Sequence, residues 1–542
     1  MDALSANLAC WLVDRAAAHP HRTALVEGVG ERRRAVTYGQ LAGRVAALAA
    51  GFRRRGIGAG DRVLLFVPMS IPLYETLLAT LHAGATAVFV DAWADRRRLD
   101  AAIAAAHPRA FVGTPRAHLL RLVSPSIRRI PIHLLAGRGR LSIDRYARPG
   151  ETSPPADVDG SAPALVTLTT GSTGRPRAAA RSHDFLRAQH AALRALMGIR
   201  EGDVDFPALP VFALNGLASG ATVVIPELDP RRPADADPER LFAQMRAEGV
   251  TVASGSPALF ERLAHWCMAR DRRIAVRALF TGGAPVTPKL ARLLADHVEG
   301  SVHVVYGSTE VEPVASVGAR VMLDAMASVE GGAEGGRGLC AGPPVEGLEV
   351  RLVRAHDAPV ELGAGGWAEW VVAPGEVGEI VAAGAHVLPG YDGDAAADRA
   401  SKIHDGDRVW HRTGDAAWRD AEGRLWLMGR VSARIVRRGE TIWPLPVEAV
   451  AAGLPGFTHA ALVGVADAEL GQRAVLCVET PMPANRLLPA FFDPLRAAVA
   501  PTPVDEIRGF TRIPRDPRHA SKTDLAALRK MLEDPAAGRI RG

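Results

Sequence analysis

Cysteine is scarce in this chain. Of its 542 residues four are cysteine, Cys10, Cys267, Cys340 and Cys477, and they lie far apart. Cysteines without paired spacing fit neither a disulfide framework nor a zinc site, and they are typical of a reducing compartment. The N-terminal residues contain no basic stretch followed by an apolar core, so we recognise no secretory signal. These absences predict a cytoplasmic protein.

An uninterrupted apolar segment suited to a membrane is also missing. The longest uncharged run, residues 206–226, has the length to cross a bilayer, but it contains three prolines, two glycines and an asparagine. Such residues favour a segment that lines a pocket over a helix that faces lipid. We therefore expect no transmembrane segment.

Several common nucleotide and hydrolase motifs do not occur. The chain has no Gly-Lys dipeptide, which excludes the P-loop signature, and no Gly-x-Gly-x-x-Gly sequence. It also has no Gly-x-Ser-x-Gly sequence, which argues against a serine hydrolase of the nucleophile-elbow type.

The charge balance is basic, but lysine is rare. The 65 basic and 59 acidic residues give a formal net charge of +6, and the basic residues are spread out rather than gathered among aromatics. This pattern favours a solvated surface over a nucleic-acid-binding one. Only four of the basic residues are lysine: Lys289, Lys402, Lys522 and Lys530. A lysine in so arginine-rich a chain indicates a place where a compact point charge is wanted.

The first half of the chain alternates between helical and strand patterns. Apolar spacing predicts helices over residues 41–52 and 74–82, and strands over 62–67 and 87–90. This alternation is typical of parallel sheets covered by helices. We predict an α/β fold with a large N-terminal domain of layered, mostly parallel sheets covered by helices.

The last hundred residues have a different pattern. They predict a short helix over 448–454, strands over 460–465 and 474–478, and helices over 488–499 and 524–532. We expect a small, mobile α+β domain here. The predicted division is residues 1–430 for the N-terminal domain and 434–542 for the C-terminal domain.

A loop rich in glycine, hydroxyl and guanidinium groups follows the apolar run 164–166. Backbone N–H groups, hydroxyls and guanidiniums can together hold a polyphosphate. Taken alone, a solvated surface loop explains this composition equally well. The candidate phosphate-binding residues are Thr169, Thr170, Gly171, Ser172, Thr173, Gly174 and Arg177.

Four further signatures follow this loop along the chain. They are Thr281-Gly282-Gly283-Ala284-Pro285; Tyr306-Gly307-Ser308-Thr309-Glu310; Thr413-Gly414-Asp415 with Gly429-Arg430; and Lys522 within residues 519–524. Each one is weak evidence alone. In this order, over residues 6–530, the chain resembles the superfamily of acyl-adenylate-forming enzymes, which includes acyl-CoA synthetases, luciferases and the adenylation domains of peptide synthetases.

The signatures contain groups suited to a nucleotide. The Tyr306 ring offers a face for a base to stack on, and Gly283 and Ala284 lack bulk. Asp415 is a suitable acceptor for ribose hydroxyls, and Arg430 is a suitable donor beside it. In isolation each residue has an ordinary structural explanation, such as a core aromatic for Tyr306 or a turn residue for Asp415.

Other residues of these signatures are suited to the phosphates of a nucleotide. Thr309 adds a phosphate donor, and Glu310 offers a hard oxygen to Mg²⁺. The resemblance implies ATP and Mg²⁺ as cofactors, with Pro285, Gly307 and Ser308 included in the nucleotide site.

The resemblance also implies that Lys522 acts as the catalytic cation, reaching the carboxylate and α-phosphate oxygens as they join. Two like charges 4 Å apart repel by roughly 4 kcal/mol at an effective dielectric near 20. A positioned ammonium lowers that barrier.

Departures from the usual pattern indicate a branch of the superfamily. Arg177 replaces a lysine, the segment 209–214 lacks a common histidine, and Ser432 occupies the hinge position. With residues 206–214, 225–230, 255–259, 402–412 and 429–432, these departures resemble the β-lactone synthetases of bacterial olefin biosynthesis. The resemblance implies adenylation of a β-hydroxy fatty acid, followed by attack of its own hydroxyl on the activated carbonyl. Because the arginine guanidinium is planar, Arg177 changes the geometry of this position relative to the usual lysine.

Other interpretations stay open from sequence. An acyl-CoA or acyl-carrier ligase would use a thiol on the same adenylate, a regulatory protein would bind the nucleotide without reaction, and an arginine-rich chain can bind nucleic acid.

His183 and His303 are candidate bases for the hydroxyl. The apolar residues 206–226 and 254–260 favour a fatty substrate. The resemblance also implies possible complexes with a thiolase, reductase or decarboxylase.

Overall fold

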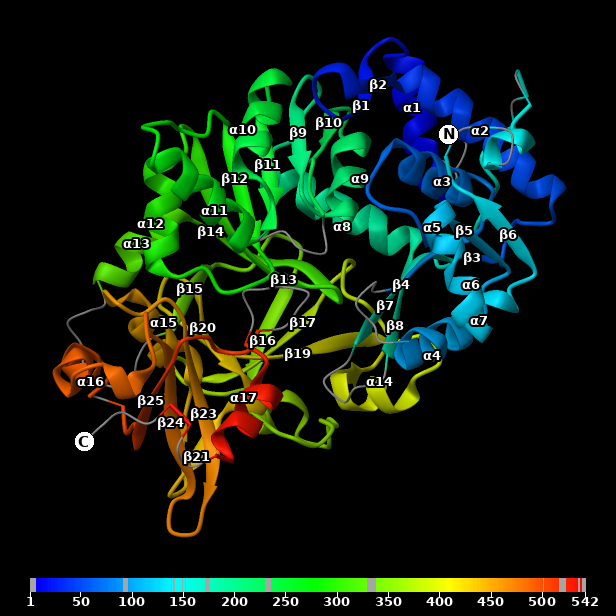
Figure 1. Ribbon diagram of the computed structural model, residues 1–542. Helices are drawn as coiled ribbons and strands as arrows, with labels where there is room; N and C mark the ends of the chain where they lie inside the picture. Colours follow the sequence, from blue (N-terminus) through cyan, green and yellow to red (C-terminus); the bar gives the residue numbers. More distant parts are fainter. Residues whose placement is uncertain are drawn as a thin grey trace.

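The computed structural model defines the architecture for most of the chain. It describes residues 6–90, 96–137, 139, 142–148, 150, 151, 153–170, 176–229, 235–328, 338–500, 502–515, 523–534, 537 and 538. Figure 1 shows the N-terminal segments, in blue to green, forming the upper part of the molecule, with the C-terminal strands in orange to red at the lower left.

Two mostly parallel sheets form the framework of the first 320 residues. One has the strand order β14-β13-β12-β11-β9-β10-β1-β2, and the other has the order β6-β5-β3-β4-β7-β8. Only the pairs β1–β2, β13–β14 and β7–β8 are antiparallel within them. The first sheet contains β1 (Thr23–Glu27), β2 (Arg34–Thr37), β9 (Val204–Pro207), β10 (Thr222–Ile225), β11 (Val252–Gly255), β12 (Ala278–Gly282), β13 (Ser301–Ser308) and β14 (Val311–Gly318). The second contains β3 (Arg62–Phe66), β4 (Thr86–Val90), β5 (Ala110–Gly113), β6 (Ile132–Leu135), β7 (Pro163–Thr170) and β8 (Pro176–Ser182).

Helices between the strands cover these sheets, as the alternating pattern predicts. Their starts are encoded locally: a capping box of Thr37 and Gln40 opens α2, and the Ser70 side chain caps α3. The helices of this part are α1 (Cys10–Ala18), α2 (Tyr38–Arg54), α3 (Ile71–His82), α4 (Arg96–Ala106), α5 (Pro115–His118), α6 (Leu120–Val123), α7 (Pro125–Arg128), α8 (His183–Met197), α9 (Pro210–Ala218), α10 (Pro238–Ala247), α11 (Pro257–Met268), α12 (Pro288–His297) and α13 (Ala319–Ser328).

A third, antiparallel sheet lies between the parallel sheets and the C-terminal part, and the sequence analysis did not anticipate it. Its order is β15-β20-β19-β17-β16, with β18 paired to β19. The strands are β15 (Leu339–Gly342), β16 (Glu349–Val353), β17 (Gly378–Ala383), β18 (Lys402–Asp405), β19 (Arg408–Arg419) and β20 (Leu425–Arg430), and α14 (Ala395–Ser401) precedes β18.

The C-terminal residues form a fourth sheet with its own helices. The strand order is β22-β21-β24-β23, and β25 pairs with β24. Two apolar clusters, within residues 435–507 and 461–537, fill this part. Its elements are β21 (Ile435–Arg437), β22 (Glu440–Ile442), α15 (Pro444–Gly453), β23 (Ala460–Asp467), β24 (Gly471–Glu479), α16 (Asp493–Val499), β25 (Glu506–Phe510) and α17 (Leu525–Leu532).

Most of the predicted elements are confirmed. The helices and strands expected over residues 41–90 correspond to α2, β3, α3 and β4, and those expected after residue 447 correspond to α15, β23, β24, α16 and α17. The helix expected over 488–499 begins as a 3₁₀ turn over Pro489–Phe492 and becomes α-helical at Asp493. Within the described part of the chain, no helix has both the length and the apolar character needed to span a bilayer.

One buried carboxyl group in the first sheet is unusual. Asp205, on β9, is completely buried, and neither side-chain oxygen has a hydrogen-bond partner among the described residues. It packs against Gly216 of α9. Burial raises the pKa of Asp205 well above its ordinary value, and the neighbouring Asp203 adds to this effect. The folded state therefore favours the protonated form of Asp205.

This carboxyl group predicts a specific pH dependence of stability. The folded state keeps its proton above the unfolded pKa near 4, so its contribution to stability is complete below that pH and is lost as the pH rises towards the folded pKa. Asp205→Asn removes the titration while keeping the shape. We expect the thermal midpoint of the variant, relative to the natural chain, to rise between pH 5 and pH 8. A difference independent of pH would contradict a protonated Asp205.

Candidate active site

The predicted phosphate loop connects two paired strands. Thr169 and Thr170 end β7, Arg177 lies in β8, and Thr169 is the register partner of Arg177. Gly171, Ser172, Thr173 and Gly174 lie outside the described residues, as do the side chains of Thr169 and Thr170. The described strands place the two ends of the loop side by side at the edge of the second sheet.

The second and third signatures lie at neighbouring strand ends. The strand β12 ends at Gly282, which pairs with Val305 of β13, the residue before Tyr306. Gly283 follows with a φ of +80°, a left-handed conformation that favours glycine. The register therefore brings the turn 283–285 to the same edge of the sheet as Tyr306.

Tyr306, Asp415 and Arg430 form a continuous chain of contacts. The Tyr306 hydroxyl donates to Asp415 Oδ2 at 2.8 Å, and Arg430 Nε lies 3.2 Å from Asp415 Oδ1. Arg430 Nη1 also donates to the Thr413 carbonyl at 2.8 Å. Burial, reinforced by the Asp415 charge, raises the pKa of Tyr306 well above its ordinary value, so the hydroxyl remains a donor. Three residues predicted from two separate signatures thus meet in space.

Glu310 is positioned by a residue that the sequence analysis did not select. The Tyr391 hydroxyl donates to Glu310 Oε1 at 2.7 Å, and Leu388 N donates to the Glu310 carbonyl at 2.7 Å. The Arg177 guanidinium lies 5.5 Å from the centre of the Tyr391 ring, within the range of a cation–π contact. Burial alone would raise the pKa of Glu310, but hydrogen bonding, that from Tyr391 included, favours the ionised form and helps to hold the pKa below its ordinary value. Glu310 is therefore an ionised oxygen donor.

A buried lysine supports the segment that carries Tyr391. Lys402, which is 3% exposed, donates to the Leu388 carbonyl, and its Nζ lies 3.1 Å from His411 Nδ1. Burial lowers the pKa of Lys402 to about 8, although the Glu310 and Asp398 charges oppose this. Burial and the Lys402 charge lower the pKa of His411 to about 3, so His411 is neutral and its Nδ1 acts as the acceptor.

Buried hydroxyl groups at this edge of the first sheet are free to hydrogen-bond a ligand. Ser256 and Thr281 lie at or just beyond the ends of adjacent strands, and their side-chain oxygens have no hydrogen-bond partner among the described residues. Such groups are normally satisfied. No group of three or more His, Cys, Asp or Glu side chains in the described part could hold a metal ion. An ion here would therefore depend on ligand oxygens as well as Glu310, an arrangement that suits Mg²⁺.

The two histidines considered as bases make local contacts. His183 is buried at the start of α8, its Nδ1 accepts from Leu8 N at 3.2 Å, and burial lowers its pKa to about 4. His303 stacks on Phe280 with ring centres 4.8 Å apart and contacts Ser301. These contacts give both rings structural roles, and they identify neither as a base.

The apolar segment 206–226 forms β9, α9 and β10. Val211, Leu214 and Leu217 of α9 line a narrow apolar crevice of about 50 Å³. Leu186 and Leu193 of α8 also line it, as do His190 and Asn215, whose side chains are hydrogen-bonded at 2.7 Å.

Lys522 itself lies outside the described residues, but the chain on both sides of it is anchored. Arg515 and Thr523 form an isolated antiparallel bridge. Arg515 Nη2 donates to Glu479 at 2.6 Å, and the Thr523 hydroxyl contacts His459 Nε2 at 2.9 Å. Residues 515 and 523 are thereby tied to β24 and to the residue before β23.

Comparison with known proteins assigns the family. A model of the AMP-binding enzyme family matches residues 12–392. The chain belongs to this family. It is 37% identical over 507 residues to an olefin beta-lactone synthetase of Stenotrophomonas maltophilia, covering 90% of this chain and 89% of the relative. A Xanthomonas campestris protein of the same name is 37% identical over 465 residues, with 82% and 80% covered. A feruloyl-CoA synthase of an Amycolatopsis species is 30% identical over 476 residues, with 86% and 87% covered.

Solved structures agree on the fold. ATP-bound MatB from Rhodopseudomonas palustris has a TM-score of 0.79 at 22% identity, covering 98% of this chain and all of that one. The amide bond synthetase McbA from Marinactinospora thermotolerans has a TM-score of 0.79 at 22% identity, with 97% and 99% covered. The predicted fold class and the resemblance to acyl-adenylate-forming enzymes are confirmed, and this AMP-binding enzyme is a ligase of that class.

The hydroxyl of Tyr306 provides a direct test of the assembled contacts. Tyr306→Phe keeps the ring but removes the hydrogen bond to Asp415. Because one such bond to a charged group contributes about 1.5 kcal/mol or more, we expect AMP and ATP to bind roughly tenfold more weakly, measured by isothermal titration calorimetry. Tyr146→Phe is the matched control, since that ring packs against Arg55 and Arg145 instead. Equal affinities for the Tyr306 variant and the natural chain would show that the hydroxyl does not support nucleotide binding.

Proposed function

We propose that this chain uses ATP to adenylate a β-hydroxy acid and then closes the acyl-adenylate to a β-lactone, releasing AMP. The observation that supports adenylation is the contact of Tyr306, Asp415 and Arg430, which come from three different strands. Their motifs follow one another along the chain in the order typical of the family. The lactone product is supported by 37% identity to two proteins named olefin beta-lactone synthetase over at least four fifths of this chain.

The base and ribose of the nucleotide are assigned to the edge where β12, β13 and β19 meet. The Tyr306 ring would stack on adenine beside the turn of Gly283, Ala284 and Pro285. Asp415 already contacts Tyr306 and Arg430, but a carboxylate has about four acceptor sites, so it can also accept from the ribose hydroxyls.

The phosphates are assigned to the loop after β7 and to the turn after β13. Thr169, Thr170, Gly171, Ser172, Thr173, Gly174 and Arg177 would contact the β- and γ-phosphates, with Gly307, Ser308 and Thr309 facing them. Glu310 would hold Mg²⁺, which neutralises phosphate charge when bound. An ionised Glu310 suits that ion because it offers carboxylate oxygen.

The first chemical step joins two anions. A carboxylate oxygen of the substrate attacks the α-phosphorus, the bond to the bridging oxygen of the β-phosphate breaks, and pyrophosphate leaves. Lys522 would stabilise the charge that develops on the oxygens around the α-phosphorus. Its chain neighbours are fixed by the Arg515–Glu479 and Thr523–His459 contacts.

The second step uses a nucleophile carried by the substrate itself. The β-hydroxyl oxygen attacks the acyl carbon, the bond from that carbon to the phosphate oxygen breaks, and AMP leaves while the hydroxyl proton passes to solvent. Because the hydroxyl is tethered to its electrophile, a high effective concentration replaces a second binding site.

We also propose a division between residues 1–430 and 434–542. It is supported by two apolar clusters confined to residues 435–537. Arg434 pairs with Asp357 across the proposed boundary. A thiolase, reductase or decarboxylase of the same pathway would form a complex with this chain, because each acts on closely related acyl compounds.

Product identity tests the lactone proposal. With ATP and a panel of 3-hydroxy acids, mass spectrometry should detect the acid less one water, together with AMP and pyrophosphate, in the absence of CoA. The relevant alternative is a CoA ligase, favoured by the 30% identity to a feruloyl-CoA synthase. Product that forms only when a thiol is added would establish that alternative instead.

The catalytic cation can be tested separately. We expect Lys522→Ala to slow pyrophosphate release by a factor on the order of 10² to 10³, with little change in ATP affinity, since the ammonium acts on the transition state. Lys530→Ala, which removes an exposed lysine of α17, is the control. Undiminished pyrophosphate release by the Lys522 variant would refute the assigned role.

A further inference from the structure

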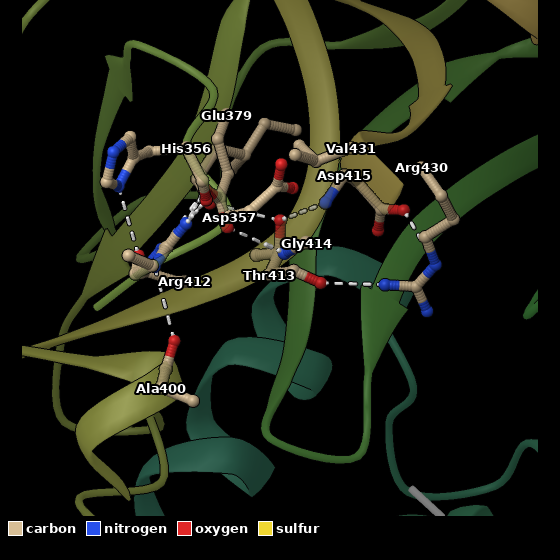
Figure 2. A network of polar contacts seen from close by, with 12 residues as sticks. His356, Asp357, Glu379, Ala400, Arg412, Thr413, Gly414, Asp415, Arg430 and Val431 are labelled. Atoms are coloured by element: carbon tan, nitrogen blue, oxygen red, sulfur yellow. Dashed lines mark hydrogen bonds and ion pairs between the residues drawn. The ribbon is translucent and has the colours of Figure 1, made fainter. Parts of the chain in front are cut away.

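A buried guanidinium lies behind the turn that presents Asp415. Arg412 of β19 is 7% exposed, and Glu379 of β17 is 2% exposed. Arg412 donates to Glu379 Oε2 from Nε at 3.1 Å and from Nη2 at 2.6 Å, as Figure 2 shows. Two charges in the interior are expensive to bury unless their remaining hydrogen-bonding capacity is satisfied.

The remaining donors of Arg412 are committed to backbone carbonyls. Nη1 donates to Ala358 O at 2.8 Å and to Ala400 O at 3.3 Å, and Nη2 donates to His356 O at 2.5 Å. With the two bonds to Glu379, all five N–H groups of the guanidinium have an acceptor. A lysine ammonium has three donors and no planar fork, so it cannot reproduce this set.

The other carboxylate oxygen of Glu379 holds the Asp415 turn. Gly414 N donates to Glu379 Oε1 at 3.2 Å, and the Thr413 hydroxyl donates to Ile380 O at 3.0 Å. The same hydroxyl accepts from Asp415 N at 3.1 Å. Gly414 has a φ of +73°, so the turn is sharp, and two neighbouring residues of β17 fix it.

The same guanidinium is linked through Asp357 to the start of the C-terminal part. The carbonyls of His356 and Ala358 flank Asp357, whose carboxylate accepts from Arg434 at 2.8 and 2.6 Å. Arg434 directly precedes β21. Figure 2 shows His356 and Asp357 near Arg412, together with the Thr413–Asp415 turn.

The cost of burial argues that this pair has a role other than stability. Replacing a buried ion pair with apolar residues of similar volume is often neutral or stabilising. We propose that Glu379 and Arg412 are positioning residues for the nucleotide: they fix the Thr413–Asp415 turn so that the Asp415 carboxylate faces Tyr306 and the ribose. This inference rests on the proposed ATP-dependent function, and neither residue is assigned a contact with the substrate.

Arg412→Lys tests the fork directly. We expect at least tenfold weaker binding of AMP and of a non-hydrolysable ATP analogue by calorimetry, and a similar rise in KM for ATP, with KM for the acid changed less than about twofold. Arg424→Lys is the control, because Arg424 pairs with Asp420 in the connection between β19 and β20, away from the Thr413–Asp415 turn. A merely structural role would lower the thermal midpoint without separating the two KM values.

A second variant covers the case in which Arg412→Lys does not fold. The double variant Glu379→Met with Arg412→Met removes both charges together, and we expect it to fold and to bind AMP at least tenfold more weakly. If either folded variant binds both nucleotides as tightly as the natural chain, the positioning role is wrong. If the natural chain itself binds neither nucleotide, the proposed function fails instead.

Discussion

The ion pair of Arg412 and Glu379 is the constraint on which the nucleotide side of the site depends. Each of its partners comes from a different segment: the carbonyls of 356 and 358, the end of α14, β17 and the turn before Asp415. Because all five N–H groups of the guanidinium donate hydrogen bonds, displacing any of these segments would break at least one of them. The antiparallel sheet therefore behaves as a rigid support, from which Asp415 reaches across to a tyrosine on a different sheet.

Glu310 is supported in a different way from Asp415. Its carboxylate is aligned by one hydroxyl, that of Tyr391, and the segment carrying Tyr391 is fixed in turn by the buried ammonium of Lys402. The two anionic groups of the site thus rely on two separate buried cations, both from the region around β18 and β19.

The sequence permitted prediction of the elements with clear periodicity and of the residues with motif signatures. The helices and strands over residues 41–90 were predictable because their apolar spacing is regular. The antiparallel sheet was not, since β17 is buried on both faces and β19 has three consecutive buried polar residues, His411, Arg412 and Thr413. Its supporting contacts join residues 33 and 81 positions apart, Glu379 with Arg412 and Glu310 with Tyr391. One sequence holds no signal for such pairings, whereas the scarcity of lysine did mark Lys402.

The use of arginine at position 177 has a physical explanation in this structure. A planar guanidinium is weakly hydrated and packs against aromatic faces, whereas an ammonium is compact and strongly hydrated. Arg177 lies over the Tyr391 ring, and that ring is hydrogen-bonded to Glu310. The surroundings of position 177 therefore suit a planar cation. At position 402 the reverse holds, because the buried space between Leu388 and His411 accommodates a point charge. The chain uses each cation where its shape and hydration match the surroundings, so the departure from lysine at 177 is consistent with the proposed phosphate site.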